Sequence, residues 1–499
     1  MNKTKSTYEA EAKRFRMPLC DRVISTELSG DYTLPDYLPE IRRILRVSPT
    51  VLPPSRYIEG KEIEFGGTAD YHMLYIASDG GLYTAPLSSD YSFSAPLDIT
   101  GDFDLNEGIT VMTDIREESI TSRVSAPRKL SIKCRLSAHV RAFGMMIAEQ
   151  SFSGEVDPFS IERLNDTCNT SLMTSALGES VELSDEISPR AENIRVIDAY
   201  ADAIINDLIP ADGAAECRGE ATLRLIICRD DDSSSAETIT RKIPFNTSIE
   251  LDDIDRETKL RGRVHCGDIS VNVEEGRILC TLSLLPEIFA SKTIPLSYTR
   301  DLYSTENHCN TAYSEYNIPL ILSTVCGNFS QSERIAVAET TAQHGSHIID
   351  IRCKPSAEKL DIDKGKYIIS GQCRYSLLLE NEGEYSMVEL SFPFKYACEG
   401  DAAEPSDFVC DLGVIACRGR IDGGNIAIDT ELSVSAEFMG SSSVVALSEA
   451  SFGERVERHD GDIVICYPTP DDTPWSIAKK YLVPVSKISA MSDYILINN

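Results

Sequence analysis

The feature that most constrains this chain is a long alternating segment that occurs three times around an equivalent glycine. Apolar and polar residues alternate over residues 63–75, 215–227 and 367–379. The glycines inside these segments, Gly67, Gly219 and Gly371, are separated by two intervals of 152 residues each. A period of two is typical of a β-strand that buries one face. The sequence therefore predicts the same long strand in three successive modules.

Two further landmarks follow each glycine in the same order. The first is a phenylalanine, which occurs as Phe93, Phe245 and Phe394. The second is a later alternating strand with a small residue two positions before a leucine, and this residue is Cys134, Cys280 or Thr430. Because three landmarks recur in one order, we expect three β-rich modules over residues 1–155, 156–300 and 301–455.

The glycines and cysteines of the repeat have structural interpretations. A glycine inside a strand indicates a bulge or a close approach of another backbone. Ala69, Ala221 and Cys373 occupy equivalent places, so cysteine is predicted to serve as a small buried residue. The chain has 15 cysteines and no CxxC pair, and its N-terminus lacks the apolar core of an export signal. We therefore expect free thiols, an intracellular protein and no metal site.

Short helices are expected ahead of the long strands. In the first module Ile41, Ile44 and Leu45 have the i, i+3, i+4 spacing of a helix face, within Pro39–Leu45. The corresponding segments are Asn193–Ala199 and, less regularly, Ser332–Ala338. The predicted fold class is therefore mainly β with short helices (α+β).

The last forty residues, 460–499, follow a different pattern. The segment 461–467 is predicted to be a strand, and a helix should begin at Pro474 with Thr473 as its N-cap. Val485–Met491 is predicted to be a second helix, and Tyr494–Ile497 a closing strand. The order strand, helix, helix, strand indicates a small separate βααβ domain.

Composition excludes some classes of partner. The chain has 48 basic and 79 acidic residues and a formal charge of −31. Nucleic acids and anionic membrane surfaces are bound mainly through Lys and Arg, so neither is an expected partner. The longest apolar runs are also far shorter than the ~20 residues that span a bilayer, so no membrane span is expected.

The C-terminal segment resembles a known signature. Asp472–Tyr481 is similar to the motif of the LysM domain, a βααβ fold that typically binds N-acetylglucosamine polymers through loops at one end. Asp471 replaces the usual glycine of that motif and Pro474 the usual leucine. Both replacements fall in or near the glycan-binding loop, which argues against glycan binding.

The repeated modules resemble the SPOCS domain. Leu28–Pro35 followed by Pro39, Glu40 and Ile41, a long Gly-containing strand and Phe93 is similar to that domain, and Leu183–Pro189 is similar in the second copy. SPOCS modules followed by one LysM domain are the layout of a family of spore-coat morphogenetic proteins. The resemblance implies a place in the mother-cell cytoplasm at the forespore surface. It also implies that the LysM-like domain binds the coat morphogenetic ATPase, stage IV sporulation protein A, with other coat proteins open as partners.

The candidate binding residues lie in the C-terminal domain. Trp475 is the only tryptophan and lies about 200° round its helix from Ile477, so it is predicted to be at least partly exposed. Ile463, Lys479 and Lys480 are the other candidates, the lysines for an acidic partner. In each case the alternative is structural: Trp475 and Ile463 would cover the edge of the small core, and the lysines would form a solvated face.

No catalytic motif is present, so we expect a non-enzymatic scaffold or adaptor without a cofactor. The sequence contains no phosphate-binding loop, nucleophile elbow, HExxH or dinucleotide glycine motif. Two alternatives remain open. One is a protein of the cell wall or spore cortex that binds peptidoglycan or a chitin-type glycan, and the other is an enzyme with an unfamiliar site.

Overall fold

The computed structural model of this chain describes most of its residues. The described ranges are 13–100, 103–104, 108–148, 150–188, 194–229, 236–343, 345–400, 404–457, 463–490 and 495–498. Strands account for 79% of the structure and helices for 4%, with a single α-helix in the described part. The prediction of a mainly β protein is therefore confirmed.

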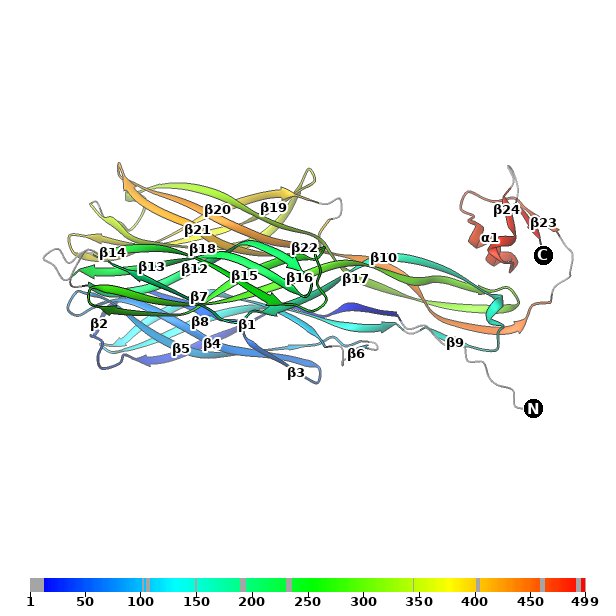
Figure 1. Ribbon diagram of the computed structural model, residues 1–499, viewed down its shortest axis with the longest axis horizontal. Coiled ribbons are helices and arrows are strands. Elements are labelled where there is room, and N and C mark those ends of the chain that lie inside the picture. The colour runs from blue at the N-terminus through cyan, green and yellow to red at the C-terminus, as the bar shows by residue number, and fades with distance from the viewer. Residues whose placement is uncertain are drawn as a thin grey trace.

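One pattern of strand pairing occurs three times along the chain, and each time it forms two sheets (Figure 1). In each copy the first strand pairs with the last, which also pairs with the strand directly before it in the chain. In the other sheet, the strand that contains the recurring glycine lies between two neighbouring strands of the same copy. Each sheet buries one of its two faces against the other sheet. The long alternating segment is the central strand of one of them. Each copy is thus a β-sandwich that holds an apolar core between its sheets.

The strands of the three copies are as follows. The first contains β1 (Lys13–Thr33), β2 (Ile41–Val51), β3 (Ser55–Glu59), β4 (Glu62–Ala77), β5 (Leu82–Pro96), β6 (Phe103–Asp104), β7 (Thr110–Ala126) and β8 (Lys129–Ala148). The second contains β10 (Ile161–Leu177), β11 (Val181–Ile187), β12 (Ile194–Ala211), β13 (Ala214–Arg229), β14 (Ala236–Glu250), β15 (Lys259–Glu274) and β16 (Arg277–Ser304). The third contains β17 (Asn307–Ala336), β18 (His347–Asp363), β19 (Lys366–Asn381), β20 (Glu384–Glu399), β21 (Asp407–Asp422) and β22 (Asn425–Arg455).

The helices predicted ahead of the long strands are wrong. Pro39–Leu45 leads into β2, and Ser332–Ala338 forms the end of β17 and the start of the 3-10 turn η3 (Val337–Glu339). Of the predicted segment Asn193–Ala199, residues 194–199 lie in β12, and Asn193 lies outside the described residues. In β2 and β12 the helix-like spacing comes from β-bulges, which place an extra residue in the strand and change its apolar period locally. The bulged residues are Leu45 in β2, Ile197 in β12 and, at the equivalent place in β18, Ile349.

In the second and third copies the recurring glycine marks a close approach of a neighbouring backbone, as predicted, whereas a Cβ at Gly67 would meet only the Tyr91 side chain, at 3.2 Å. A Cβ added at Gly219 would clash with the carbonyl oxygen of Ile204 and with the ring of Phe245, and Gly371 is equally crowded. Phe245 lies directly opposite Gly219 in the register. In the first copy the residue opposite Gly67 is Tyr91, whereas Phe93 lies opposite Phe65. The aromatic landmark of that copy is therefore Tyr91 rather than Phe93.

The three sandwiches meet in one apolar cluster, which we call the central cluster. It contains equivalent residues from every copy: Leu74, Ile76, Leu82, Ile197, Ile226, Cys228, Ala236, Ile349, Leu378 and Tyr385. Hydrogen bonds around this cluster join each copy to the next. Thr84 of β5 donates to the carbonyl of Ile197, Thr238 of β14 donates to that of Ile349, and Arg43 of β2 donates to that of Tyr385 in β20. The three sandwiches therefore close a ring.

A β arm extends from this ring (Figure 1). It consists of the ends of β16, β17 and β22 together with β10, and β9 (Ser151–Ser153) pairs with β22 inside it. β16 continues to Ser304, past the boundary predicted at residue 300. The arm has its own apolar clusters, which include Leu302, Leu447 and Phe452.

A small domain lies at the far end of the arm (Figure 1). It contains β23 (Ile463–Cys466), α1 (Pro474–Tyr481), the 3-10 turn η4 (Val485–Lys487), β24 (Ile488–Ala490) and β25 (Ile495–Asn498). Its sheet has the order β23-β25-β24. The predicted second helix over Val485–Met491 is wrong, because residues 485–490 form one 3-10 turn and then a strand paired with β25, and Met491 lies outside the described residues. Within the described residues, no helix has the length and apolar character needed to cross a bilayer.

Candidate partner-binding site

The helix α1 positions the predicted binding residues. Thr473 is its N-cap and Pro474 begins it, as predicted. The Thr473 hydroxyl accepts from the Ser476 amide at 3.1 Å, while the Ser476 hydroxyl accepts from the Thr473 amide at 2.9 Å, which completes a capping box. Ile477 and Ala478 are buried in the core of the domain, as the helical spacing indicates. This inward face determines where the neighbouring side chains point.

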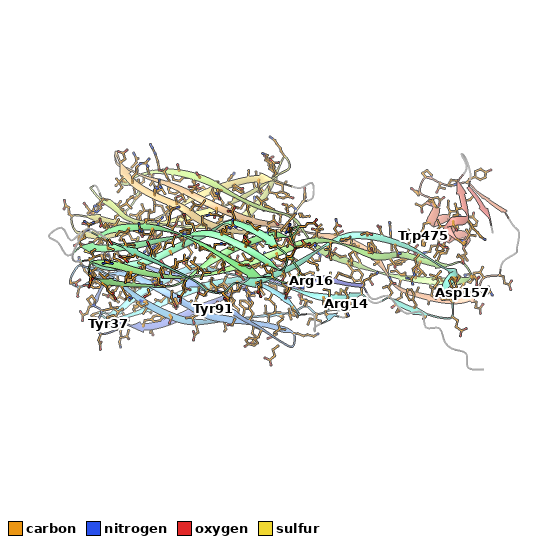
Figure 2. All side chains as sticks on the ribbon, in the orientation of Figure 1. Arg14, Arg16, Tyr37, Tyr91, Asp157 and Trp475 are labelled. Atoms are coloured by element: carbon orange, nitrogen blue, oxygen red, sulfur yellow. The ribbon has the colours of Figure 1, made fainter. Side chains whose placement is uncertain are left out.

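Trp475 contacts the arm (Figure 2). Its indole Nε1 donates to the Oδ2 atom of Asp301 at 2.8 Å. Its ring meets that of Tyr303 edge to face, with 4.9 Å between centroids and 68° between planes. The Tyr303 side chain is only 1% exposed, and its hydroxyl donates to the carbonyl of Val483 at 2.7 Å. Trp475, which is itself half-buried, thus covers an aromatic residue of β16.

The carboxylate of Asp301 accepts hydrogen bonds from several side chains. Besides Trp475, it accepts from the Nζ atom of Lys479 at 2.6 Å and from the hydroxyl of Tyr313 at 2.7 Å. Burial raises the pKa of Asp301, but these hydrogen bonds outweigh burial and hold that pKa below its usual value. Burial likewise lowers the pKa of Lys479, and its pairing with Asp301 raises it above normal overall. Both groups therefore stay charged around neutral pH.

The other two predicted residues lie elsewhere. Lys480 is exposed, and its Nζ atom lies 5.7 Å from the ring centroid of Tyr481. Ile463 is the first residue of β23, but its side chain lies outside the described residues. The structure therefore brings Trp475 and Lys479 together at the arm and does not bring Lys480 to that contact.

The arm side of this contact was not predicted from the sequence. Asp301 and Tyr303 lie at the end of β16, and Tyr313 lies in β17. The one available signal was the strand alternation that continues past residue 300, which indicates a strand longer than the module needs. Nothing in that alternation indicates which residues the C-terminal domain covers.

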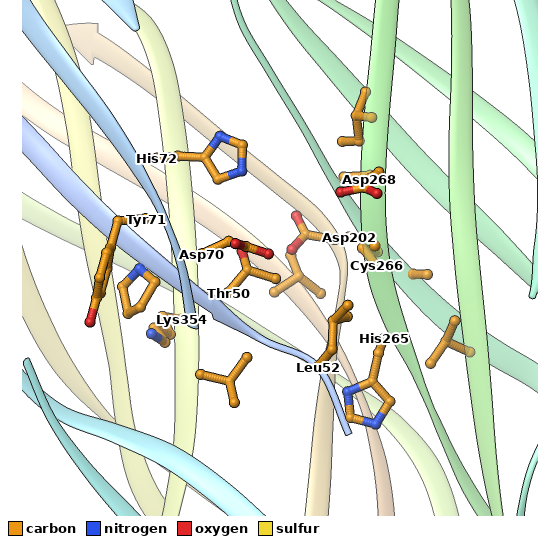
Figure 3. A pocket seen from close by; sticks show the side chains of 18 of the residues that line it. Thr50, Leu52, Asp70, Tyr71, His72, Asp202, His265, Cys266, Asp268 and Lys354 are labelled. Atoms are coloured by element: carbon orange, nitrogen blue, oxygen red, sulfur yellow. The ribbon is translucent and has the colours of Figure 1, made fainter. Parts of the chain in front are cut away.

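A cavity of about 700 Å³ lies between the three sandwiches (Figure 3). Its lining includes Thr50, Asp202 and Lys354, which are equivalent residues of β2, β12 and β18. Burial raises the pKa of Asp202, and burial together with the nearby Asp268 raises that of Asp70. Lys354 is paired with Glu117. The junction of the three copies thus brings three aspartates, Asp70, Asp202 and Asp268, to the same cavity as Lys354.

One cluster in the described residues has the spacing of metal ligands. Atoms of Asp21, His139 and Asp407 lie within 4.8 Å of one another. The guanidinium of Arg141 lies 3.3 Å from the His139 ring and 3.5 Å from the Asp407 carboxylate. A fixed cation therefore already balances the carboxylates, and the geometry fits an ion-pair cluster between β1, β8 and β21 better than a metal centre.

Comparisons of this chain with protein-family models, with curated proteins and with solved structures found no match.

Proposed function

We propose that this protein is a non-enzymatic scaffold of spore-coat assembly that uses no cofactor. Its C-terminal domain binds the coat morphogenetic ATPase, stage IV sporulation protein A, in the mother-cell cytoplasm at the forespore surface. The resemblances of Asp472–Tyr481 to the LysM signature and of Leu28–Pro35 to the SPOCS domain support this identity. Because the replacements at Asp471 and Pro474 fall near the glycan loop, a protein partner is favoured over a sugar.

The observation that carries the proposal is the place of the C-terminal domain, which lies at the end of the β arm and away from the ring (Figure 1). The arm is a packed structure, since Leu302, Leu447 and Phe452 form an apolar cluster within it. A packed arm holds its terminal domain at a distance from the ring better than a flexible linker does. This arrangement suits an adaptor that presents one binding domain while its body makes other contacts.

The test is co-purification of the full-length chain with the ATPase. Lys480→Glu should weaken the association roughly fivefold, because reversing an exposed interface charge opposes an acidic partner. Lys395→Glu, a charge reversal at an exposed residue of β20, is the matched control and should leave binding unchanged. Trp475→Glu should also reduce recovery of the ATPase.

Two results would contradict the proposal. The first is that the wild-type chain fails to bind the ATPase. The second is that it is retained on peptidoglycan instead, which would favour the alternative of a glycan-binding protein of the cell wall or cortex.

A further inference from the structure

The C-terminal domain contacts the arm through an interface of specific side-chain interactions. We call the domain side, formed by Trp475, Lys479 and the Val483 carbonyl, the docking face. The arm side is formed by Asp301, Tyr303 and Tyr313. Tyr303 is an arm residue, yet it belongs to the same apolar cluster as Ile477, Ala478 and Val483 of the domain. An aromatic ring, an ion pair and directed hydrogen bonds thus hold the domain in one orientation.

The docking face contains two of the residues that the sequence predicts for partner binding. In the docked position the indole N–H of Trp475 and the ammonium of Lys479 are both satisfied by Asp301. A partner that binds these groups has to replace the Asp301 carboxylate and the Tyr303 ring. The arm therefore already contacts the indole of Trp475 and the ammonium of Lys479, which an acidic partner surface with an apolar centre would bind.

The contact is also limited enough to be reversible. In the described residues, the cluster that joins the domain to the arm includes one buried arm side chain, that of Tyr303. Seven residues separate Arg455, the end of β22, from Ile463, the start of β23. Fully extended, seven residues reach about 25 Å, so the domain can leave the arm and remain tethered close to it. Such a tether gives the arm a high effective concentration against a partner in solution.

We propose that the arm is an intramolecular competitor for the docking face, so that binding of the ATPase displaces the C-terminal domain from Asp301 and Tyr303. This inference rests on the proposed function, because it describes how that binding is regulated. The free protein is then mostly docked and binds with reduced affinity, since only the undocked fraction is competent. Weakening the arm side should strengthen binding without any change in the domain itself.

The single tryptophan reports docking independently of the partner. Asp301→Lys places a cation against Lys479 and removes the acceptor of the Trp475 indole, so it should release the domain and shift the Trp475 emission to longer wavelength. Tyr313→Phe removes one donor from Asp301 and keeps the ring, so it should give a smaller shift in the same direction. Asp166→Asn is the matched control, because Asp166 is an exposed arm carboxylate paired with Arg300, 3.6 Å away. Its emission should match wild type.

Affinity for the ATPase is then measured with the same full-length variants. We expect Asp301→Lys to bind about tenfold more tightly than wild type, Tyr313→Phe to lie between them, and Asp166→Asn to equal wild type. Unchanged or weaker binding by Asp301→Lys, despite a shifted emission, overturns the competition. An unshifted emission in that variant overturns the docking itself.

Failure of the proposed function gives a different result. If neither wild type nor Asp301→Lys binds the ATPase, the proposed partner is wrong, and this inference falls with it even when the emission shifts. Binding by both proteins, tighter for Asp301→Lys than for wild type, supports both the partner and the competition.

Discussion

Cysteine serves in this protein as a small core residue. Ala69, Ala221 and Cys373, which occupy equivalent places in the three copies, are all fully buried. Burial raises the pKa of Cys217 to about 11 and that of Cys266 to about 12, which suppresses the reactive thiolate. The interchange of Ala and Cys along the repeat was enough to predict this burial, because a small apolar position accepts either residue.

Thiol reactivity should be confined to one residue. Cys326 is the one exposed cysteine of the fifteen, all of which lie in described residues. We expect a chromogenic disulfide reagent at about pH 8 to modify a single thiol quickly in the native protein, and the others only on unfolding. Cys326→Ser should remove the fast phase. A second fast-reacting thiol that persists in that variant would show that another of the fifteen cysteines is accessible to solvent.

The residues of the candidate site were only partly predictable. The spacing around Ile477 gave the orientation of α1, because a helix that buries one face fixes where its other side chains point. The contact of Trp475 with Asp301 and Tyr303 was not predictable, since it joins residues that are 174 and 172 positions apart in the sequence. The local sequence pattern shows which side chains point away from the core of the small domain, but it does not show which residues they contact.

At the level of single elements, the β-bulges explain why strand patterns resembled helices. Leu45, Ile197 and Ile349 each interrupt the register of their strand with an extra residue. Ile197 and Ile349 belong to the central cluster, and Leu45 packs against it. A regular period of two would leave these strands without an apolar residue at that position facing the other copies. The bulge thus supplies the contact between copies and also produces the spacing of three that suggests a helix.

The recurring glycines should be intolerant of substitution. Gly219→Ala is expected to destabilise the protein by about 2–3 kcal/mol or more, because its methyl group would overlap the Ile204 carbonyl and the Phe245 ring. Thermal unfolding followed by circular dichroism measures this loss. Gly453→Ala in β22 is the matched control. Its nearest neighbour, the carbonyl oxygen of His308 in β17, would lie 3.7 Å from the added Cβ, so the change should be nearly neutral. Equal melting temperatures of the two variants would contradict the crowding at Gly219.

Over the whole molecule, buried charges hold the three copies together. Arg46, Asp198 and Asp350 are equivalent residues, and Arg46 lies 3.3 Å from Asp198 and 3.8 Å from Asp350. Arg352 lies 2.6 Å from Asp198. Burial, together with the neighbouring Arg352, lowers the pKa of Arg46 to about 10, against the opposing effect of Asp198 and Asp350, so the group is charged near neutral pH. Three side chains of the same charge at these equivalent positions would repel one another. Charges of opposite sign attract, and they favour one arrangement of the three copies around the ring.

The repeat was predictable from the sequence, but the ring was not. The interval of 152 residues predicts three copies, and copies can follow one another without touching. A signal was present in Arg46, Asp198 and Asp350, since charged residues of opposite sign at equivalent places in apolar strands have no other obvious partner. Recognising that signal required knowing that equivalent positions meet at one centre, which strand periodicity does not reveal.

Because the charges are shared, the three copies should unfold together. Asp198→Ala removes the nearer carboxylate of Arg46 and Arg352 and leaves both cations to share Asp350, so we expect a loss of about 3 kcal/mol. Hydrogen exchange should show that β4, β13 and β19, one strand from each copy, lose protection to a similar extent. Calorimetry should show one main transition for the ring, shifted as a whole to lower temperature.

Asp361→Ala is the control for this prediction. Asp361 is an exposed residue of β18 that pairs with Lys359, so its removal should cost less than about 1 kcal/mol. If Asp198→Ala reduced protection in β13 alone while β4 and β19 kept theirs, the copies would be independent domains. A cooperative ring would instead transmit the loss of protection from one copy to all three. In the case of independent domains, the central cluster and the buried charges would be no more than contacts between neighbouring domains.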